Sequence, residues 1–354
     1  MELQSPLSIA GVILVIALVL FGLNALIGPP SNQLSLSQKV IDVLDDNSSS
    51  YPLAPELVGI KGYINADDDF TLASLKGKVV IVDFWTYSCI NCIRTQPYLN
   101  AWYEKYHPQG LEIVGVHTPE FDFEKKYENV QAAVLKEGIQ YPVVMDNDYQ
   151  TWRAYQNRYW PRKYLIDAQG HIRYDHIGEG SYEETEKEIQ LLLAERDQTM
   201  GLTEIVSDDV KENLGATEFQ KIGTPELYLG YEFARAPLAN SEGFQPDQTI
   251  HYSLPSTLTS NLVALEGEWI NHPESMELNG ETGKVILPFT AKQVNIVASG
   301  PAKLEISLDG GPITLLPIEG ETLYTVVEGT TYDSHTLTLT IDGKGFNLYT
   351  FTFG

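Results

Sequence analysis

Residues 79–92 read VVIVDFWTYSCINC, and this stretch decides the fold. Its first half, residues 79–85, is a mostly β-branched and apolar run, which is typical of a strand buried on both faces. The two cysteines of the chain, Cys89 and Cys92, follow directly, and the residues after them can form a helix. A cysteine pair at this spacing, after a strand and at a helix start, is the arrangement of a dithiol redox site.

Thiol–disulfide exchange requires two cysteines that lie close together. One thiolate attacks the substrate disulfide, and a second thiol must then reach the mixed disulfide and resolve it. A helix N-terminus supplies backbone N–H groups and a partial positive charge, and both favour a thiolate there. The spacing therefore predicts a redox centre at Cys89 and Cys92, with Ile90 and Asn91 as residues that contact the substrate.

A metal site is the main alternative for two nearby cysteines. A structural zinc ion needs four ligands, and the chain has no second cysteine pair. Its histidines are scattered, and His171 and His176 stand five residues apart on one predicted strand, so that they point to opposite faces. We therefore expect neither a metal nor a cofactor. Two inert buried cysteines are a further alternative.

Length and composition limit the domain count and the kind of partner. A chain of 354 residues with 43% hydrophobic residues suggests two domains with sizeable cores. It carries 23 Lys and Arg against 48 Asp and Glu, a net charge of −25 at pH 7. This balance argues against nucleic-acid binding, which needs basic patches. The acidic residues are spread along the chain, as on a solvated acidic surface.

Residues 7–27 are almost wholly apolar and contain no Lys, Arg, Asp or Glu. This length can cross a bilayer as a helix, and Pro29 and Pro30 would end that helix. A cleaved signal peptide is the alternative, but Glu2 is the only charge before the run, and residues 23–26 form a poor cleavage site. We predict a single-pass signal anchor over residues 1–28 that holds the protein at the cell membrane with its soluble domains extracytoplasmic.

A polar tether is predicted over residues 29–50, and residues 51–197 then alternate strand and helix patterns. Strands are expected at 79–85, 111–116, 141–145, 163–166 and 171–175, and helices at 92–106, 127–137, 149–157 and 182–196. The alternation predicts an α/β sheet covered by helices on both faces. Pro97 is expected to break or kink the first of these helices.

The pattern changes after a predicted linker at residues 198–214. Residues 215–354 contain short alternating runs, such as 303–308, in a background rich in Thr, Leu, Val and Gly. Turn signals recur at residues 309–311, 319–320 and 342–343. This segment therefore predicts an all-β sandwich.

Several blocks of the chain resemble known proteins. Residues 83–92 resemble the active-site region of the thioredoxin superfamily. GVHTPEF (115–121), YWPRKYLID (159–167) and GEGSY (178–182) resemble the soluble region of the DipZ-type family, which is close to the TlpA-like membrane-anchored thioredoxins. TPELYLG (224–230) and YTFTFG (349–354) resemble its carbohydrate-binding-module-like tail. The resemblance covers about residues 52–354 and implies a thioredoxin-like domain followed by that β domain.

The resemblance also implies roles for individual residues. Cys89 would be the exposed nucleophile, Cys92 the resolving thiol, and Asp83 the buried acid that exchanges a proton with Cys92. A carboxylate in an apolar strand should have a pKa raised by desolvation, and the alternative for Asp83 is a strand-end cap or a solvated residue. Pro161 matches the cis-proline beside the dithiol, and Trp160 before it would offer its backbone to an extended substrate segment.

Further residues have less specific roles. Trp85 would flank the site as an aromatic contact for the substrate, with core packing as the alternative. His117 and Glu120 follow a strand end and could tune the proton chemistry, with a hydrogen-bonded turn as the alternative. Some TlpA-like relatives have a Glu three residues after the second cysteine. This chain has Thr95 there, which puts a carboxylate relay of that kind in doubt.

These features predict a membrane-anchored extracytoplasmic thiol–disulfide oxidoreductase that reduces protein disulfides. DipZ-type proteins carry a multi-helix membrane electron carrier, and this chain has one apolar helix in its place. The resemblance therefore implies that electrons come from a separate membrane thiol carrier.

Two other functions stay open. A peroxiredoxin-like peroxidase fits half of its pattern at Thr86 and Cys89, but Val82 stands where that pattern has Pro. A glycan- or partner-binding β domain on a redox scaffold would use surface aromatics. Candidates are Trp269, Tyr324 and Tyr332, although burial is the more frequent fate of such side chains.

Overall fold

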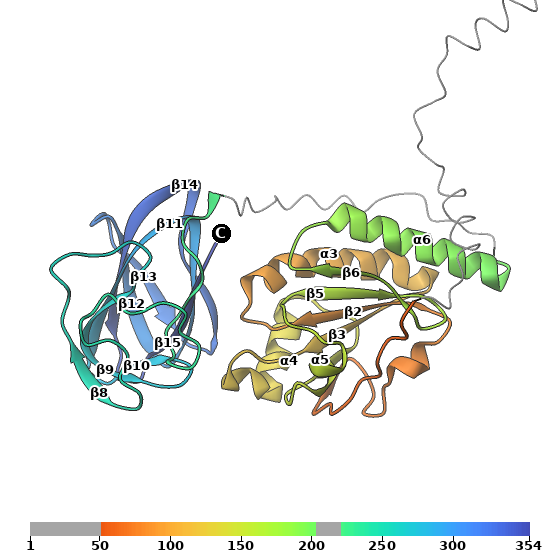
Figure 1. Ribbon diagram of the computed structural model, residues 1–354, viewed down its shortest axis with the longest axis horizontal. Coiled ribbons are helices and arrows are strands. Elements are labelled where there is room, and N and C mark those ends of the chain that lie inside the picture. The colour runs from red at the N-terminus through yellow and green to blue at the C-terminus, as the bar shows by residue number, and fades with distance from the viewer. Residues whose placement is uncertain (1–50, 203–220) are drawn as a thin grey trace, which may run out of the picture. The chain divides into compact units, whose positions relative to one another are not determined.

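The computed structural model describes residues 51–202 and 221–354 of the chain (Figure 1). The predicted anchor at 1–28, the tether at 29–50, most of the linker at 198–214 and the start of the β domain at 215–220 lie outside these ranges. No helix within the two described ranges is long and apolar enough to span a membrane.

A six-stranded sheet forms the centre of residues 51–202 (Figure 1). Its strands are β1 (Tyr63–Ile64), β2 (Val79–Trp85), β3 (Leu111–His117), β4 (Val143–Met145), β5 (Arg162–Ile166) and β6 (Ile172–Ile177). They are hydrogen-bonded in the order β1-β4-β3-β2-β5-β6. Strand β2 pairs in parallel with β3 and antiparallel with β5, so the strand that leads into the cysteines lies inside the sheet.

Helices cover both faces of this sheet. They are α3 (Ile90–Tyr106), α4 (Tyr127–Lys136), α5 (Gln150–Ala154) and α6 (Tyr182–Met200). On one face of β2, Ile81 belongs to the same hydrophobic cluster as Leu99 of α3 and Leu193 of α6. On the other face, Phe84 clusters with Trp152 of α5. Figure 1 shows α3 and α6 together on one side and α5 on the other, and the predicted α/β fold is confirmed.

Two local predictions differ from the structure. Helix α3 begins at Ile90 and continues through Pro97, so the predicted break is not observed. The buried side chains of Leu99 and Trp102 anchor the helix beyond the proline, and packing of this kind supplies most helix stability in proteins. His171, which was predicted on the same strand as His176, precedes β6.

Residues 221–354 form a β domain, as predicted. Its strands are β7 (Leu227–Tyr228), β8 (Thr249–Tyr252), β9 (Ala264–Asn271), β10 (Met276–Leu278), β11 (Thr282–Ser299), β12 (Ala302–Leu308), β13 (Thr314–Ile318), β14 (Thr322–Asp342) and β15 (Asn347–Phe353). Strand β11 pairs with β14 along its length, with β9 near its start and with β15 near its end. These pairings join the strands of this range into one curled antiparallel sheet around a core that includes Trp269 and Leu339.

Candidate active site

Cys89 and Cys92 lie at the start of α3. Cys89 is the N-cap residue, and its Sγ accepts a hydrogen bond from the backbone N–H of Cys92 at 3.4 Å. Both thiols are free. Cys89 is partly exposed, whereas Cys92 is only 1% exposed. A substrate can therefore reach Cys89 first, with Cys92 held behind it.

Cys92 is a poor nucleophile in its resting environment. Burial raises the pKa of its thiol well above the usual range, and the hydrogen bond with Cys89 raises it further. The nearby charge of Asp83 also raises this pKa, whereas a backbone hydrogen bond with Thr86 lowers it. Because the thiolate is the reactive form, Cys92 needs a base at neutral pH.

Asp83 is the candidate for that base, because its charge acts on Cys92. It lies within β2, is 1% exposed, and neither of its carboxylate oxygens has a hydrogen-bond partner. Burial raises the pKa of its carboxyl group to about 7, and the charge of Lys163 opposes this rise. A group with this pKa can accept and release a proton near neutral pH. The alternative of a strand-end cap is wrong, because Asp83 caps no backbone group.

The Trp160–Pro161 peptide bond is cis. Strand β5 pairs with β2 so that Arg162 lies opposite Phe84, which places Pro161 beside the end of β2 where the cysteine loop begins. The indole N–H of Trp160 donates to the Thr118 carbonyl at 3.1 Å. Within the described ranges, the backbone N–H and C=O of Trp160 have no hydrogen-bond partner, so both are free to pair with an extended segment.

Two predicted substrate contacts are buried. Trp85 is 1% exposed, and its ring packs edge-on against His117 with centroids 5.2 Å apart. Ile90 is 7% exposed. The prediction that these side chains contact the substrate is therefore wrong, because both pack into the core. Asn91 between the cysteines is partly exposed and remains a candidate contact.

His117 is enclosed by aromatic rings at the end of β3. It stacks on Tyr87 with centroids 5.7 Å apart, and the Trp85 ring meets it nearly at a right angle. Burial lowers the pKa of His117 to about 3, so its ring is neutral at physiological pH. Its Nε2 lies 3.4 Å from the Thr86 hydroxyl. These contacts favour a role in holding the loop before the cysteines over a role in proton transfer.

Glu120 contacts the β domain. The Tyr228 hydroxyl donates to Glu120 Oε1 at 2.7 Å. Removal from water raises the pKa of the Glu120 carboxyl group to about 8, and neighbouring Glu124 adds to this rise. The hydrogen bond from Tyr228 opposes it. Glu120 is therefore mostly protonated at neutral pH, and its side chain is hydrogen-bonded to a tyrosine of the β domain.

Sequence reasoning missed Glu124, which fixes the cysteine loop. Its buried Oε1 accepts from the Ser88 hydroxyl at 2.7 Å and from the Ser88 N–H at 3.3 Å. Its Oε2 accepts from the N–H groups of Glu120 at 2.5 Å and Phe121 at 3.0 Å. Since Ser88 precedes Cys89, this carboxylate connects the loop after β3 to the redox centre. The sequence feature that could have indicated Glu124 is its place in the aromatic segment FDFE, residues 121–124.

Lys163 was also missed. It is 0% exposed and lies directly opposite Asp83 in the β2–β5 pair. The feature that could have indicated Lys163 is a lysine two residues after Pro161, in a strand that is otherwise mostly buried.

Thr95 occupies the position at which some TlpA-like relatives have a glutamate. Its hydroxyl donates to the Asn91 carbonyl at 2.8 Å and lies 3.3 Å from the Tyr182 hydroxyl. A threonine hydroxyl cannot take the proton of a thiol as a carboxylate can. Among the carboxylates in the described residues, Asp83 is therefore the candidate for the role that this glutamate would have.

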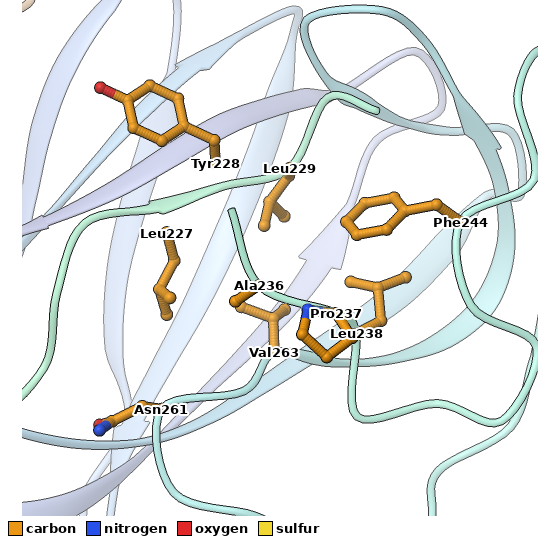
Figure 2. Close-up of a pocket in the computed structure, with 9 residues that line it drawn as sticks. All are labelled: Leu227, Tyr228, Leu229, Ala236, Pro237, Leu238, Phe244, Asn261 and Val263. Carbon is orange, nitrogen blue, oxygen red and sulfur yellow. The ribbon is translucent and has the colours of Figure 1, made fainter. Parts of the chain in front are cut away.

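The β-domain aromatics do not form an open sugar platform. Trp269 is fully buried, and its indole N–H donates to the Glu266 carbonyl at 3.0 Å. Tyr324 is half-buried with its hydroxyl bonded to Gly320, and Tyr332 is half-buried beside Lys221. Figure 2 shows the residues that line a small, mostly apolar cavity, Tyr228 among them. The volume of this cavity is about 10 Å³. A cavity of this size holds about one water molecule.

The chain matches two family patterns. The AhpC/TSA family matches residues 55–175, and the "Thioredoxin like C-terminal domain" matches residues 224–354. The two matches cover most of the two described ranges.

Named relatives match the same regions. Protein DipZ of Mycobacterium bovis is 38% identical over 304 residues, which are 85% of this chain and 43% of DipZ. The chain thus spans less than half the length of this relative. Thiol-disulfide oxidoreductase YkuV of Bacillus subtilis is 30% identical over 142 residues, covering 40% of this chain and 94% of YkuV. Thiol-disulfide oxidoreductase ResA of Bacillus thuringiensis is 33% identical over 115 residues, covering 32% of this chain and 64% of ResA.

Proposed function

Since the chain belongs to the thioredoxin-like thiol-disulfide oxidoreductases, we propose that it reduces disulfide bonds of extracytoplasmic proteins through Cys89 and Cys92. One observation carries the proposal. A partly exposed cysteine caps α3, and a buried cysteine lies behind it beside a carboxyl group whose pKa is about 7. This arrangement supplies a nucleophile, a resolving thiol and a base.

The first step uses Cys89. Its thiolate attacks one sulfur of the substrate disulfide, the substrate S–S bond breaks, and the other substrate sulfur leaves as a thiolate that takes a proton. The backbone N–H of Cys92 donates to the Cys89 sulfur and so orients this nucleophile at the start of α3. The free backbone of Trp160 would align the substrate beside Pro161.

The second step releases the substrate. Asp83 takes the proton of Cys92, and the Cys92 sulfur attacks Cys89, so that a Cys89–Cys92 disulfide forms and the mixed disulfide breaks. The second substrate sulfur leaves and is protonated. Two electrons have then passed to the substrate, and a donor dithiol must reduce the protein again.

The proposal extends to location and donor. The apolar segment at residues 7–27 would anchor the chain in the cell membrane, with both domains extracytoplasmic. A separate membrane thiol carrier would then supply the electrons. Protease protection of sealed vesicles tests the location, since domains outside the cytoplasm should be cleaved only when their side of the membrane is exposed.

The peroxidase alternative has less support. Its pattern requires Pro at position 82, but Val82 lies inside β2, between β3 and β5. A proline there would remove a backbone hydrogen bond from the sheet. Stopped-flow mixing of the reduced protein with peroxide discriminates the two functions, because a peroxidase would oxidise Cys89 rapidly in a single turnover.

A trapping experiment tests the exchange mechanism. In Cys92→Ser the resolving thiol is absent, so mixed disulfides should accumulate on Cys89 during expression of the full chain, and mass spectrometry would identify the substrates. Cys89→Ser/Cys92→Ser is the matched control and should trap nothing. Recovery of Cys92→Ser without adducts would contradict the proposed function.

The reduction potential tests the direction of electron flow. Equilibration with glutathione buffers should give a value nearer to the about −270 mV of thioredoxin than to the about −120 mV of the oxidant DsbA. A value near the second figure would make the protein a disulfide-forming enzyme.

A further inference from the structure

Lys163 is a buried cation in the same layer as the redox centre. It is 0% exposed, and it pairs directly with Asp83 across β2 and β5. Directly opposed residues of an antiparallel pair project to the same face of the sheet. Leu165, two positions along β5, belongs to the cluster that also contains Cys92. The Lys163 side chain therefore extends toward the layer between the sheet and α3.

Several contacts of Lys163 support its protonated form against the effect of burial. Its Nζ donates to the Gly178 carbonyl at 3.2 Å. The same atom lies 5.9 Å from the ring centroid of Tyr182, within cation–π range. Burial lowers the pKa of Lys163, whereas the charges of Asp83, Cys92 and Glu179 raise it. Burial has the larger effect, so the pKa of Lys163 is lowered overall, and the carbonyl, the aromatic face and the nearby acids offset part of the loss of water.

No other side chain takes this place beside Asp83 in the sheet. Its neighbour on β3 is Gly115, where an added Cβ would lie 3.0 Å from Trp85 Nε1. Lys163 is also the cation that lowers the pKa of Asp83. The other titratable groups around the pair are Cys92 on α3, Tyr141 before β4, His176 on β6, Glu179 after β6 and Tyr182 on α6.

Asp83 and Lys163 do not form a direct ion pair. Both carboxylate oxygens of Asp83 lack a hydrogen-bond partner, while the Lys163 ammonium is bonded to Gly178. A direct pair would hold the carboxylate tightly in its charged form. The cation acts on the carboxylate through space, and both oxygens stay free for a proton.

We propose that Lys163 is a positioning residue of the redox centre, which keeps Asp83 ionised until Cys92 gives up its proton. The inference rests on the proposed function. During resolution the S–H bond of Cys92 breaks and an O–H bond forms on Asp83. Cys92 then bonds to Cys89, and the substrate sulfur leaves with the electron pair of the mixed disulfide. Lys163 next faces a neutral acid, which eases loss of that proton to solvent.

A carboxyl titration tests the inference without a substrate. The full reduced chain is labelled with ¹³C at aspartate carboxyl carbons, and Asp83→Asn identifies the signal. Lys163→Met has an uncharged side chain of similar length and should raise the Asp83 midpoint by about one pH unit or more. Lys163→Arg keeps the charge and should leave the midpoint near that of the wild type.

Lys78→Met is the matched control. Lys78 pairs with Glu112 at 2.8 Å, just before the start of β2 and away from the cysteines. Its replacement should leave the Asp83 midpoint unchanged. If Lys163→Met also leaves it unchanged, or if Lys78→Met moves it equally, the inference is overturned.

Kinetics give a second readout. Resolution of a preformed mixed disulfide at pH 7 should be about fivefold slower in Lys163→Met, because a one-unit rise from about 7 lowers the ionised fraction of Asp83 at that pH from about one half to about one tenth. In an Asp83→Asn background the same substitution should cause no further slowing. Equal slowing in both backgrounds would show that Lys163 does not act through Asp83 and has only a structural role. Absence of trapped substrates from Cys92→Ser would count against the proposed function alone, because the carboxyl titration does not depend on it.

Discussion

At the residue scale, Asp83 and His117 show how burial sets protonation in this protein. Burial raises the pKa of Asp83 to about 7 and lowers that of His117 to about 3. Both shifts have the same cause, because a medium without water disfavours the charged form of either group. Asp83 can therefore exchange protons at neutral pH, whereas His117 stays neutral. Asp83 is therefore the candidate base of the site, whereas His117 acts through packing.

The Asp83 pKa predicts a pH-dependent stability. In the folded protein the Asp83 carboxyl group keeps its proton up to about pH 7, whereas in the unfolded chain it loses this proton near pH 3.8. The stabilisation by this proton is therefore complete below about pH 4 and is lost as the pH rises through about 7. The unfolding free energy should fall by an amount on the order of 4 kcal/mol over this pH range. Urea unfolding gives the free energy of unfolding of the wild type and of Asp83→Asn/Lys163→Met at each pH. The difference between the two proteins should change by this amount between pH 4 and pH 8. Parallel pH profiles would contradict the prediction.

At the element scale, the short 3-10 helix η4 (Asp122–Lys125) and the cysteine loop are held together by one carboxylate. Glu124 accepts from Ser88 in the cysteine loop and from the N–H groups of Glu120 and Phe121. Four donors thus converge on a buried acid. The N-terminus of α3 and the end of β3 are thereby fixed relative to each other.

Replacing this carboxylate should loosen the loop. Glu124→Gln exchanges one acceptor oxygen for an amide group that faces backbone or hydroxyl donors, at an expected loss of about 1–3 kcal/mol in unfolding free energy. Glu128→Gln, on the exposed face of α4, should change it by less than about 0.5 kcal/mol. Urea unfolding measures both variants, and equal effects would argue that Glu124 has no special place in the loop.

At the scale of the whole molecule, charge is far from balanced. The chain has 48 acidic and 23 basic residues, for a net charge of −25 at pH 7. Such an excess keeps a protein soluble but opposes its compact state through self-repulsion. The same excess would repel acidic partners and favour substrates with basic or neutral surfaces near their disulfides.

Salt should therefore stabilise the protein. Raising sodium chloride from about 10 mM to about 100 mM shortens the screening length from about 30 Å to about 10 Å. The thermal midpoint should rise by a few degrees, corresponding to about 1 kcal/mol. Potassium chloride should act equally, because the effect is screening and not ion binding. A falling midpoint would show that the ion pairs outweigh the repulsion.

Local sequence determined much of the fold and the nucleophile. The apolar run at residues 79–85 predicted β2 because its neighbours bury both faces, and the cysteine spacing predicted the dithiol at the start of α3. The resemblance around Trp160 and Pro161 indicated the cis bond that the structure contains. These features depend on neighbours in sequence or on short recognisable blocks.

Tertiary structure alone decided which side chains surround the dithiol. Lys163 meets Asp83 because β5 returns antiparallel beside β2 with one particular register, and Glu124 reaches Ser88 only because the loop after β3 folds over the cysteine loop. Trp85 turns into the core although it lies next to the site in sequence. Sequence by itself thus determined the sulfur chemistry of this protein. The pairing of distant strands decided the electrostatics, because charges act through space and a register shift of one residue moves a side chain to the opposite face.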